Sequence, residues 1–420
     1  MSGPLSGIRV VDFSRVLAGP LCARTLLDLG AEVIKIEPPR PDVSRFAFPS
    51  TPGMSGYYAQ QNAGKRNVSI DLNVPGAHEL ALRLCDTADV VVENFRAGTL
   101  RYFGLDYETL AARNPRLIYA SITGYGQGGP WQGRMAYAPT VQAEAGFTHN
   151  SIRHYGEALG EPRTDSLSHA DVYAGLQAAI AILAALHRRV ATGTGEYIDV
   201  AMAATLMAVN ERAHVDLNDA DLGDEPAILG ATDCPFFVGP GGERFTVATS
   251  LVGSRTFPSW LRAMRRADLA DDPRFATAAA RRSNFEELHR LVQKWILTFH
   301  DTGALDAQLD EAKIAFGEVR SLNQLAEWSG PNIGARSRRS PTATAATTAC
   351  PAARGVSRAS RSRRLVNPPF RASTTAPSLP SSASAIAKST PISSPARSSA
   401  RQFPNPQTTG TRYDPLSRCH

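Results

Sequence analysis

The first forty residues of the chain contain a strand, a helix and a second strand in close succession. Arg9–Phe13 is a short run of β-type residues, Leu21–Leu29 has the spacing of an amphipathic helix, and Ala31–Glu37 is a second strand that ends at two prolines. Segments this close together predict a βαβ unit, because parallel strands need a crossover between them. The chain is therefore expected to contain a parallel sheet.

The alternation of strands and helices continues through residue 122. Helices are predicted at 75–87, with Pro75 in the first turn, and at 107–113, and strands are predicted at 88–93 and 117–122. We therefore predict the α/β class, with a Rossmann-like open parallel sheet and a ligand crevice at the carboxyl ends of its strands. The chain has no Gly-x-Gly-x-x-Gly after its first strand and no Walker loop, which argues against the usual nicotinamide and nucleoside triphosphate sites.

A second pattern begins after the polar link 216–225. Residues 234–249 predict a β-hairpin that turns at Gly239–Gly242. Helices are then predicted at 258–264, 285–299 and 302–312. We predict a large Rossmann-like domain over residues 1–215 and a smaller α+β domain over residues 216–330.

The net charge of +6 comes from the last part of the chain. From Arg336 onward there are 14 Arg or Lys residues and one acid, Asp414, whereas the first 335 residues carry a net charge of −7. Residues 331–420 are rich in Ser, Thr, Ala, Pro and Arg, which predicts a basic, low-complexity, disordered tail. Because the folded part is acidic, we expect no nucleic-acid partner.

The cysteines and the apolar runs indicate a cytoplasmic protein. Five cysteines, far apart and without a Cys-x-x-Cys pair, argue against both a disulfide framework and a metal site. No apolar run reaches spanning length without a charge or a turn breaker, and residues 1–10 show no secretory signal. We therefore expect no membrane association.

One aspartate stands at the start of a long apolar helix. Residues 170–187 predict that helix, and residues 192–200 predict a glycine turn with a strand behind it. Helix N-terminal amides and the helix dipole favour an anion, so we expect Asp171 to be ionised and available as a nucleophile. The alternative is that Asp171 only caps the helix.

A set of short segments occurs in order over about the first 330 residues: Asp12–Phe13, Leu17–Pro20, Leu29–Glu37, Asn62–Asp71, Val92–Gly98, Ile122–Gly126, and the Asp171 helix with Thr192–Gly195. Together these segments resemble one family, the family III coenzyme A transferases, which includes formyl-CoA and carnitine CoA transferases. The resemblance implies an intertwined homodimer of ring-like subunits, each with a large and a small domain. It also implies that residues 1–215 form the CoA-binding and catalytic domain.

The activity that the resemblance implies is transfer of CoA from an acyl-CoA to a carboxylic acid. Asp171 would attack the thioester carbonyl, form a mixed anhydride and then an aspartyl-CoA thioester, and pass CoA to the acceptor. A carboxylate is nucleophilic at neutral pH, so neither a metal nor a histidine base is required. Amides near Leu17 and Ala18, or at the start of the Asp171 helix, would stabilise the negative charge on the thioester oxygen. CoA would be a substrate, with no cofactor bound permanently.

Binding of CoA needs cations for its phosphates, and the resemblance assigns its contacts. The residues at matching positions are Val16, Leu17, Ala18, Arg40, Lys65, Asn94, Phe95 and Arg134. Relatives often have a basic residue eight positions after the asparagine, whereas this chain has Tyr102 there, next to Arg101.

The same fold supports α-methylacyl-CoA racemases, which leaves a second reading open. That reaction needs a second acid or base, typically a histidine after the Gly-Tyr-Gly strand, and residues 130–146 contain none. Relatives of that kind also tend to have Asn where this chain has Leu167. Transfer is therefore preferred to racemisation. The other histidines considered as proton shuttles are His149, His154 and His169.

The end of the chain departs from the family. Members end with a segment that returns to the large domain, and nothing after about Trp328 resembles it. One hypothesis is a reading-frame slip in a GC-rich coding sequence, which would leave apolar surface of the large domain uncovered. The third reading of the chain follows from this: a catalytically impaired CoA-binding protein that lacks its C-terminal segment.

Overall fold

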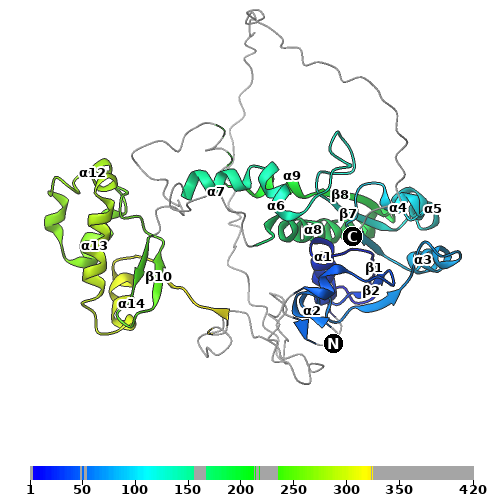
Figure 1. Cartoon of the computed structure of the whole chain (residues 1–420), viewed down its shortest axis with the longest axis horizontal. Coiled ribbons are helices and arrows are strands. Elements are labelled where there is room, and N and C mark those ends of the chain that lie inside the picture. Colours follow the sequence, from blue (N-terminus) through cyan, green and yellow to red (C-terminus); the bar gives the residue numbers. More distant parts are fainter. Residues whose placement is uncertain are drawn as a thin grey trace, which may run out of the picture. The chain divides into compact units, whose positions relative to one another are not determined.

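The computed structural model describes residues 3–47, 50, 51, 54–155, 167–211, 213, 217, 235–322 and 324. Within residues 3–211 it contains a six-stranded parallel sheet with the order β5-β2-β1-β6-β7-β8 (Figure 1). The strands are β1 (Arg9–Asp12), β2 (Glu32–Glu37), β5 (Arg66–Ser69), β6 (Val90–Glu93), β7 (Ile118–Thr123) and β8 (Glu196–Ala201). From β1 the chain adds β2 and β5 on one side of the sheet and then adds β6, β7 and β8 on the other side. Ligands of such sheets bind at the point between β1 and β6 where this change of side occurs.

Helices cover both faces of the sheet. One face packs against α1 (Ala18–Asp28) and α8 (His169–Thr192), and the other packs beneath α3 (Ala77–Asp86), α4 (Thr99–Tyr102) and α5 (Tyr107–Arg113) (Figure 1). Side chains alternate between the faces because successive residues of a strand point in opposite directions. In β6, for example, Val90 and Val92 join the core beside α1 and α8, and Val91 joins the other core.

The helices α1 and α8 approach each other closely because α8 presents small residues to α1. A Cβ on Gly175 would lie 2.5 Å from the carbonyl oxygen of Ala18. By length and composition alone α8 is long and apolar enough to cross a membrane, contrary to the sequence expectation. Its alanine-rich face, however, lies in the protein core, as expected of a core helix in a globular domain.

Shorter elements complete this part of the chain. They are the 3-10 helix η1 (Val43–Phe46), the small hairpin of β3 (Ser50–Thr51) and β4 (Met54–Ser55), and the helices α2 (Gly56–Asn62), α6 (Ala138–Glu144), α7 (Phe147–Tyr155) and α9 (Met202–Val209). Helix α2 begins at Ser55, whose hydroxyl accepts the N–H of Tyr58 at 2.9 Å. That cap places Tyr57 in the first turn of α2.

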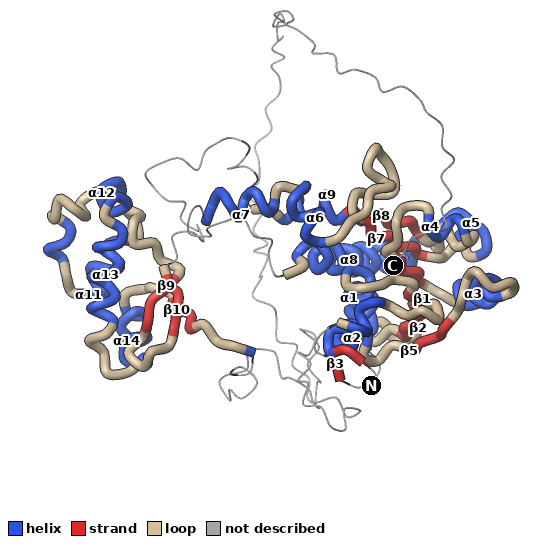
Figure 2. The backbone as a smooth tube through the Cα atoms, viewed as in Figure 1, coloured by secondary structure: helices blue, strands red, loops and turns tan. Residues whose placement is uncertain are grey.

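Residues 235–322 form an antiparallel sheet and a set of helices (Figure 2). The sheet has the order β11-β10-β9, and the elements are β9 (Phe236–Val238), β10 (Arg244–Val247), β11 (Phe316–Glu318), α11 (Phe257–Met264), η4 (Ala267–Ala270), α12 (Ala278–Ser283), α13 (Phe285–Ile296) and α14 (Thr302–Glu311). Trp260 lies at the centre of their core, fully buried, with its indole N–H donating to the Thr249 carbonyl at 3.0 Å. The predicted hairpin is confirmed as the pair β9–β10.

The predicted α/β class and most predicted elements are confirmed, with shifted ends. Helix α1 begins at Ala18 and not at Leu21, and α3 begins after Gly76, so Pro75 precedes the helix and is not in its first turn. The boundary near residue 215 stays a prediction, because residues 218–234 lie outside the described part. The predicted disorder of residues 331–420 also concerns residues outside it.

Candidate active site

Asp171 lies in the first turn of α8, but it does not cap the helix. The N-cap is Ser168, so the capping interpretation is wrong. The half-buried Asp171 carboxylate instead accepts the backbone N–H of Ala18, at the start of α1. Burial raises the pKa of Asp171 to about 6, although this hydrogen bond lowers it. Burial thus outweighs the interactions that favour the anion, but the group is still mostly ionised at neutral pH.

The segment that carries the Ala18 N–H comes directly after β1. Its residue Val16 has a positive φ of 64°, which is unusual for a β-branched side chain. Leu17 and Ala18 are buried, and Gly19 has no room for a Cβ, which would lie 2.1 Å from the Ser14 Cβ. Val16, Leu17 and Ala18 are thus brought against the start of α8, and their predicted contacts with CoA stay predictions.

Lys65 has a different place from the one expected of a phosphate ligand. Its ammonium donates to Asp12, to the Pro20 carbonyl and to the Asn62 side chain, each at 2.9 Å. Its side chain is only 1% exposed. Since an ammonium has three donors and all three have acceptors, Lys65 neutralises buried Asp12 and braces the start of α1. The expected contact of Lys65 with a CoA phosphate stays a prediction, and it would require Lys65 to give up one of these three hydrogen bonds.

Asn94 and Phe95 follow β6, next to the point where the strand order reverses. The Asn94 side chain accepts the N–H of Arg15 at 2.7 Å and donates to the Arg15 carbonyl at 2.8 Å. Phe95 packs against the core beneath α3–α5, and its N–H donates to Glu93 at 2.8 Å. Both lie at the predicted edge of the sheet, and the structure shows that Asn94 also holds the segment after β1.

The two predicted arginines differ in how they are held. Arg40 follows β2 and is exposed, and within the described ranges it has no ion-pair partner. Arg134 pairs with Glu144 at 2.6 Å and lies over the ring of Trp131, with 4.6 Å from its guanidinium carbon to the ring centroid. Arg40 is thus the cation most accessible to a phosphate, and a contact by Arg134 would compete with Glu144. Both assignments stay predictions.

Tyr57 is a residue near Asp171 that the sequence reasoning missed. It is half-buried in the first turn of α2. Burial and the negative charges of Asp171 and Asp42 raise the pKa of Tyr57 to about 12, so its hydroxyl keeps its proton at neutral pH. A tyrosine pair after a glycine carries no motif, and only the folded chain reveals that the charge of Asp171 acts on Tyr57.

Another carboxyl group with a raised pKa, that of buried Glu93, lies on the opposite face of the sheet. Glu93, at the end of β6, accepts the Ser121 hydroxyl and the Phe95 N–H. Burial, and to a smaller extent the negative charge of Asp199, raise the pKa of Glu93 to about 7 against the effect of those hydrogen bonds. Glu93 braces the segment that carries Asn94, and it was not among the predicted site residues.

The histidines considered for a racemase have separate places. His169 is the first residue of α8, where its ring stacks on Tyr173 with 5.7 Å between centroids. His149 lies on α7, and the side chain of His154 lies outside the described residues. Among the described side chains, no contact pairs one of these histidines with Asp171 as a second acid or base.

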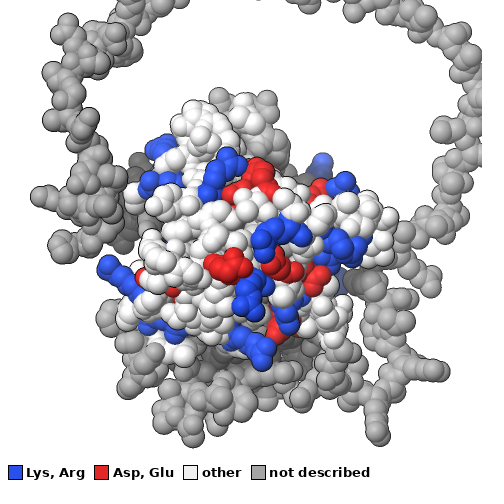
Figure 3. Space-filling model, turned by 90° about the vertical axis from the view of Figure 1, so that its right-hand side faces the viewer, with Lys and Arg blue, Asp and Glu red and all other residues white. Residues whose placement is uncertain are grey.

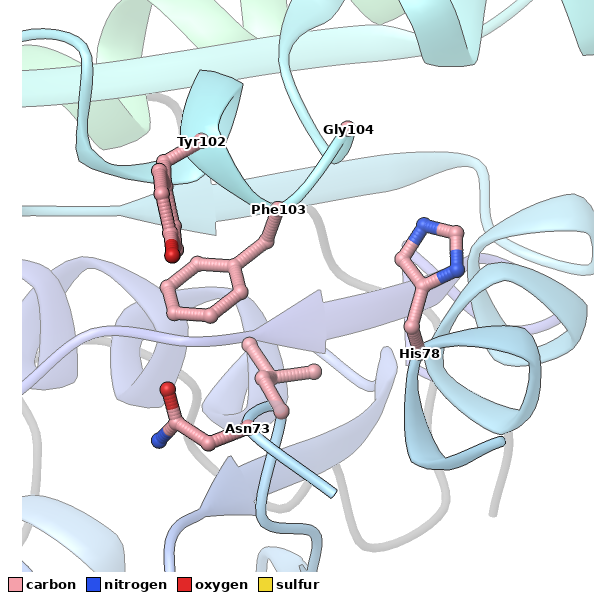
Figure 4. A pocket seen from close by; sticks show the side chains of 6 residues that line it. Asn73, His78, Tyr102, Phe103 and Gly104 are labelled. Atoms are coloured by element: carbon pink, nitrogen blue, oxygen red, sulfur yellow. The ribbon is translucent and has the colours of Figure 1, made fainter. Parts of the chain in front are cut away.

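An open hollow of about 490 Å³ lies between the segments that follow β5 and β6. Figure 4 shows the Tyr102 and Phe103 rings and the Asn73 side chain around one part of it, and the His78 ring at another. Leu72 and Gly104 complete its lining. Tyr102 is 84% exposed. An exposed aromatic surface beside amide and imidazole groups suits a heterocyclic base.

Basic and acidic side chains are interspersed on the face that Figure 3 shows. On α3–α5, Arg113 pairs with Asp86 at 2.5 Å and Arg101 with Glu108 at 3.0 Å. Both pairs are largely exposed, so they add little to stability. Arg101, the basic residue next to Tyr102 in the sequence, is thus paired with the acidic residue Glu108.

Comparisons with known proteins agree with this geometry. The model of CoA-transferase family III matches residues 5–369 and so extends past Trp328, where the sequence alone suggested that the likeness ends. The succinate–glutarate CoA-transferase of Agrobacterium fabrum is 35% identical over 80% of this chain and 84% of its own length. The succinyl-CoA:mesaconate CoA-transferase of Haloarcula hispanica is 34% identical over 72% of this chain and 78% of its own.

Solved structures show the same fold. A CAIB/BAIF family protein from Brucella suis is similar with a TM-score of 0.65 and 33% identity, over 78% of this chain and 87% of that one. The relatives named above are CoA-transferases, which does not favour the racemase reading or the impaired binding protein. The chain belongs to CoA-transferase family III and is a coenzyme A transferase.

Proposed function

We propose that the chain moves CoA from an acyl-CoA thioester to a carboxylic acid through covalent intermediates on Asp171. The observation that carries this proposal is the half-buried Asp171 carboxylate, held by the Ala18 N–H where the start of α8 meets the start of α1. A nucleophile must be both ionised and poorly hydrated, and a carboxylate with a pKa of about 6 is both at neutral pH.

The exchange balances in four steps, each of which forms one bond and breaks one. An Asp171 oxygen attacks the thioester carbonyl, and the C–S bond breaks to give a mixed anhydride and CoA thiolate. The thiolate attacks the aspartyl carbonyl and releases the donor acid. The acceptor carboxylate then attacks the aspartyl-CoA thioester, and the released thiolate attacks the acceptor carbonyl and regenerates Asp171. No proton donor is consumed, because every leaving group is a thiolate or a carboxylate.

Two donors near Asp171 suit the oxygen that becomes negative in these steps. Within the described residues, the N–H of Leu17 at the start of α1 has no acceptor, and Tyr57 keeps a phenolic proton close to the carboxylate. Preorganised donors of this kind stabilise a developing oxyanion. We propose that Leu17 N–H and the Tyr57 hydroxyl serve this purpose.

CoA itself is proposed to lie along the carboxyl edge of the sheet. Its adenine would enter the hollow beside Tyr102 and Phe103, and Arg40 would contact a phosphate. Asn94 and Phe95 follow β6, the strand next to β1, and Asn94 contacts the segment that leads into α1. These two residues would line the path of the pantetheine arm. The carboxyl ends of the strands are where ligands bind in open α/β sheets.

The functional unit is proposed to be a homodimer. Helix α8 leaves an apolar stripe exposed at helical spacing, formed by Leu176, Ile180 and Val190, of which Ile180 is 60% exposed. Exposed apolar side chains on one side of a helix favour an interface, and a second copy of this chain is the occupant that the family resemblance implies. The described cysteines, Cys22 and Cys85, are buried and free, which is consistent with the proposed cytoplasmic location.

The relatives suggest the class of substrate. Both CoA-transferases named above carry succinate or succinyl-CoA in their names, together with glutarate or mesaconate. We therefore propose succinyl-CoA as donor and a dicarboxylic acid as acceptor. The test is a panel of acyl-CoAs against succinate, glutarate, mesaconate, oxalate, formate and carnitine, followed by chromatography of the CoA products.

The role of Asp171 is tested by trapping. Hydroxylamine or borohydride is added during turnover, and mass spectrometry of the peptide that contains residue 171 should find the modified aspartate. Asp171→Asn should lose turnover but still bind CoA, and Asp268→Asn, which changes an exposed carboxylate in another part of the chain, should keep wild-type activity. An unmodified peptide from a protein that still turns over would contradict the mechanism.

A further inference from the structure

The backbone at Val16 is held in a conformation that its side chain disfavours. Its φ of 64° lies in the left-handed region, where a β-branched residue is strained. Such strain persists only where the surroundings hold it, and it is concentrated at functional sites. Val16 lies two residues before Ala18, whose N–H is bound to Asp171.

A buried carboxylate holds Val16 from one side. Asp42 is fully buried, and its carboxylate accepts the N–H of Val16 at 2.9 Å and the N–H of Ser44 at 3.0 Å. The Lys35 ammonium lies 3.9 Å from the same carboxylate and donates to the Ser14 carbonyl at 2.6 Å. The segment that follows β2 is thereby bonded to the segment that follows β1.

Asn94 holds the preceding residue from the other side. Its amide bonds both the N–H and the carbonyl of Arg15, at 2.7 and 2.8 Å. A side chain that bonds both polar groups of one residue fixes the orientation of two peptide planes. Residues 15 and 16 are thus clamped between the ends of β2 and β6, on either side of β1.

We propose that Asp42 and Asn94 are positioning residues for the transferase reaction: they clamp Val16 in its strained conformation and thereby aim the Ala18 N–H at the Asp171 carboxylate. This inference rests on the proposed role of Asp171. Neither residue needs to contact the reacting atoms, because the clamp acts through the backbone of residues 15–18. Without it, Val16 relaxes to a negative φ and the direction of the following peptides changes.

The first test is the pH dependence of kcat/KM in Asp42→Ala and Asp42→Asn. Loss of the Ala18 hydrogen bond removes an interaction that favours ionised Asp171, so the acid limb should move to higher pH by about one unit. Activity at pH 6 should then fall about fivefold more than activity at pH 8, because the ionised fraction of Asp171 drops mainly at the lower pH. Asp42→Asn keeps the shape of the side chain and one acceptor oxygen, and should shift the limb in the same direction by less.

The direction of this shift separates the clamp from simpler effects. Removing the Asp42 charge by itself would favour ionised Asp171 and move the limb to lower pH. A variant that is only less stable would lose the same factor at every pH at which it is folded. Of the titratable groups near Asp171, Tyr57 on α2 stays protonated over this range, and His169, on the same helix, is checked by its own Gln variant.

The second test is a double-mutant cycle with Val16→Gly. Glycine adopts a positive φ without strain, so the clamp becomes less necessary. Asp42→Ala should therefore cost at least fivefold less kcat in the Val16→Gly background than in the wild type. Additive losses together with an unmoved acid limb would overturn the proposal. If Asp171→Asn is inactive in that case, only the clamp fails; if Asp171→Asn turns over, the proposed mechanism fails as well.

Discussion

At the scale of single residues, burial and its compensation by hydrogen bonds and charges set the pKa of each carboxyl group. Asp171 and Glu93 both have raised pKa values because burial disfavours their charged forms, whereas Glu37 has a pKa of about 2 because hydrogen bonds and the charges of Arg45 and Lys35 outweigh its burial. The same chemical group, a carboxyl, therefore occurs as the proposed nucleophile at Asp171, as a proton-binding brace at Glu93 and as an ion-pair partner at Glu37.

The pKa of Asp171 predicts how activity depends on pH. Since only the ionised form attacks the thioester, kcat/KM should be constant above about pH 7 and should fall about tenfold per unit below pH 6. The measurement is kcat/KM with succinyl-CoA and glutarate from pH 5 to 8.5, with circular dichroism at each pH to confirm folding. Constant activity down to pH 5 would show that an exposed or different group is rate-determining.

Tyr57→Phe should separate chemistry from binding. Loss of the hydroxyl should lower kcat about 10- to 100-fold, because one donor to the developing oxyanion is gone. The KM for acyl-CoA and the thermal midpoint should stay near the wild-type values, since the ring is kept. Tyr137→Phe, at an exposed tyrosine, is the matched control. Equal losses in both variants would remove Tyr57 from the site.

The raised pKa of Glu93 predicts how the free energy of unfolding changes with pH. Its pKa is raised from 4.5 to about 7 in the folded chain, so its contribution to stability is complete below about pH 4.5 and is lost as pH rises through about 7. Glu93→Gln cannot ionise, so it should raise the free energy of unfolding at pH 8 by about 1–3 kcal/mol and change it little at pH 5. Urea unfolding at both pH values measures this, with exposed Glu79→Gln as control. A variant that is less stable at pH 8 contradicts the prediction.

At the scale of elements, the site depends on the close approach of α1 and α8. Two helices approach this closely only where small residues face each other, and Gly175 lies directly against the Ala18 carbonyl in the first turn of α1. The contact joins the strained segment after β1 to the first turn of α8. Neither helix alone would hold Asp171 against the Ala18 N–H.

Gly175→Ala tests that contact. Its Cβ would lie 2.5 Å from the Ala18 carbonyl oxygen, so the helices must separate. We expect a loss of about 1–3 kcal/mol in the free energy of unfolding and a fall of about tenfold in kcat/KM, because Ala18 moves relative to Asp171. Gln177→Ala, on the exposed side of α8, is the control. Wild-type activity in Gly175→Ala would show that the spacing of the helices is not critical.

At the scale of the whole molecule, the exposed stripe of α8 makes oligomeric state part of the proposal. Ile180→Asp places a charge in the stripe and should convert the dimer into a monomer in multi-angle light scattering at micromolar concentration. Leu297→Asp, at an exposed leucine after α13, should leave the mass unchanged. A monomeric wild-type protein would contradict the proposed dimer. An Ile180→Asp variant that is still dimeric would show that the interface lies elsewhere.

Much of the fold followed from local patterns, and much of the site did not. The βαβ unit over residues 9–37 was predictable because apolar periodicity and proline breaks are local signals. The burial of Lys65 was not predictable, because its environment depends on Asp12 and Pro20, which are distant in sequence. Tyr57 and Asp42 were missed because a single tyrosine or a buried aspartate has no spacing to recognise.

The sequence by itself determined the class of sheet, the long helix that begins near Asp171 and the family to which the chain belongs, because these are written in periodicity and in short ordered motifs. The tertiary structure decided the protonation of Asp171, the burial of Lys65 and the clamp on Val16. Those properties depend on desolvation and on hydrogen bonds between strand ends that lie far apart in the chain. Only the folded molecule brings these groups together.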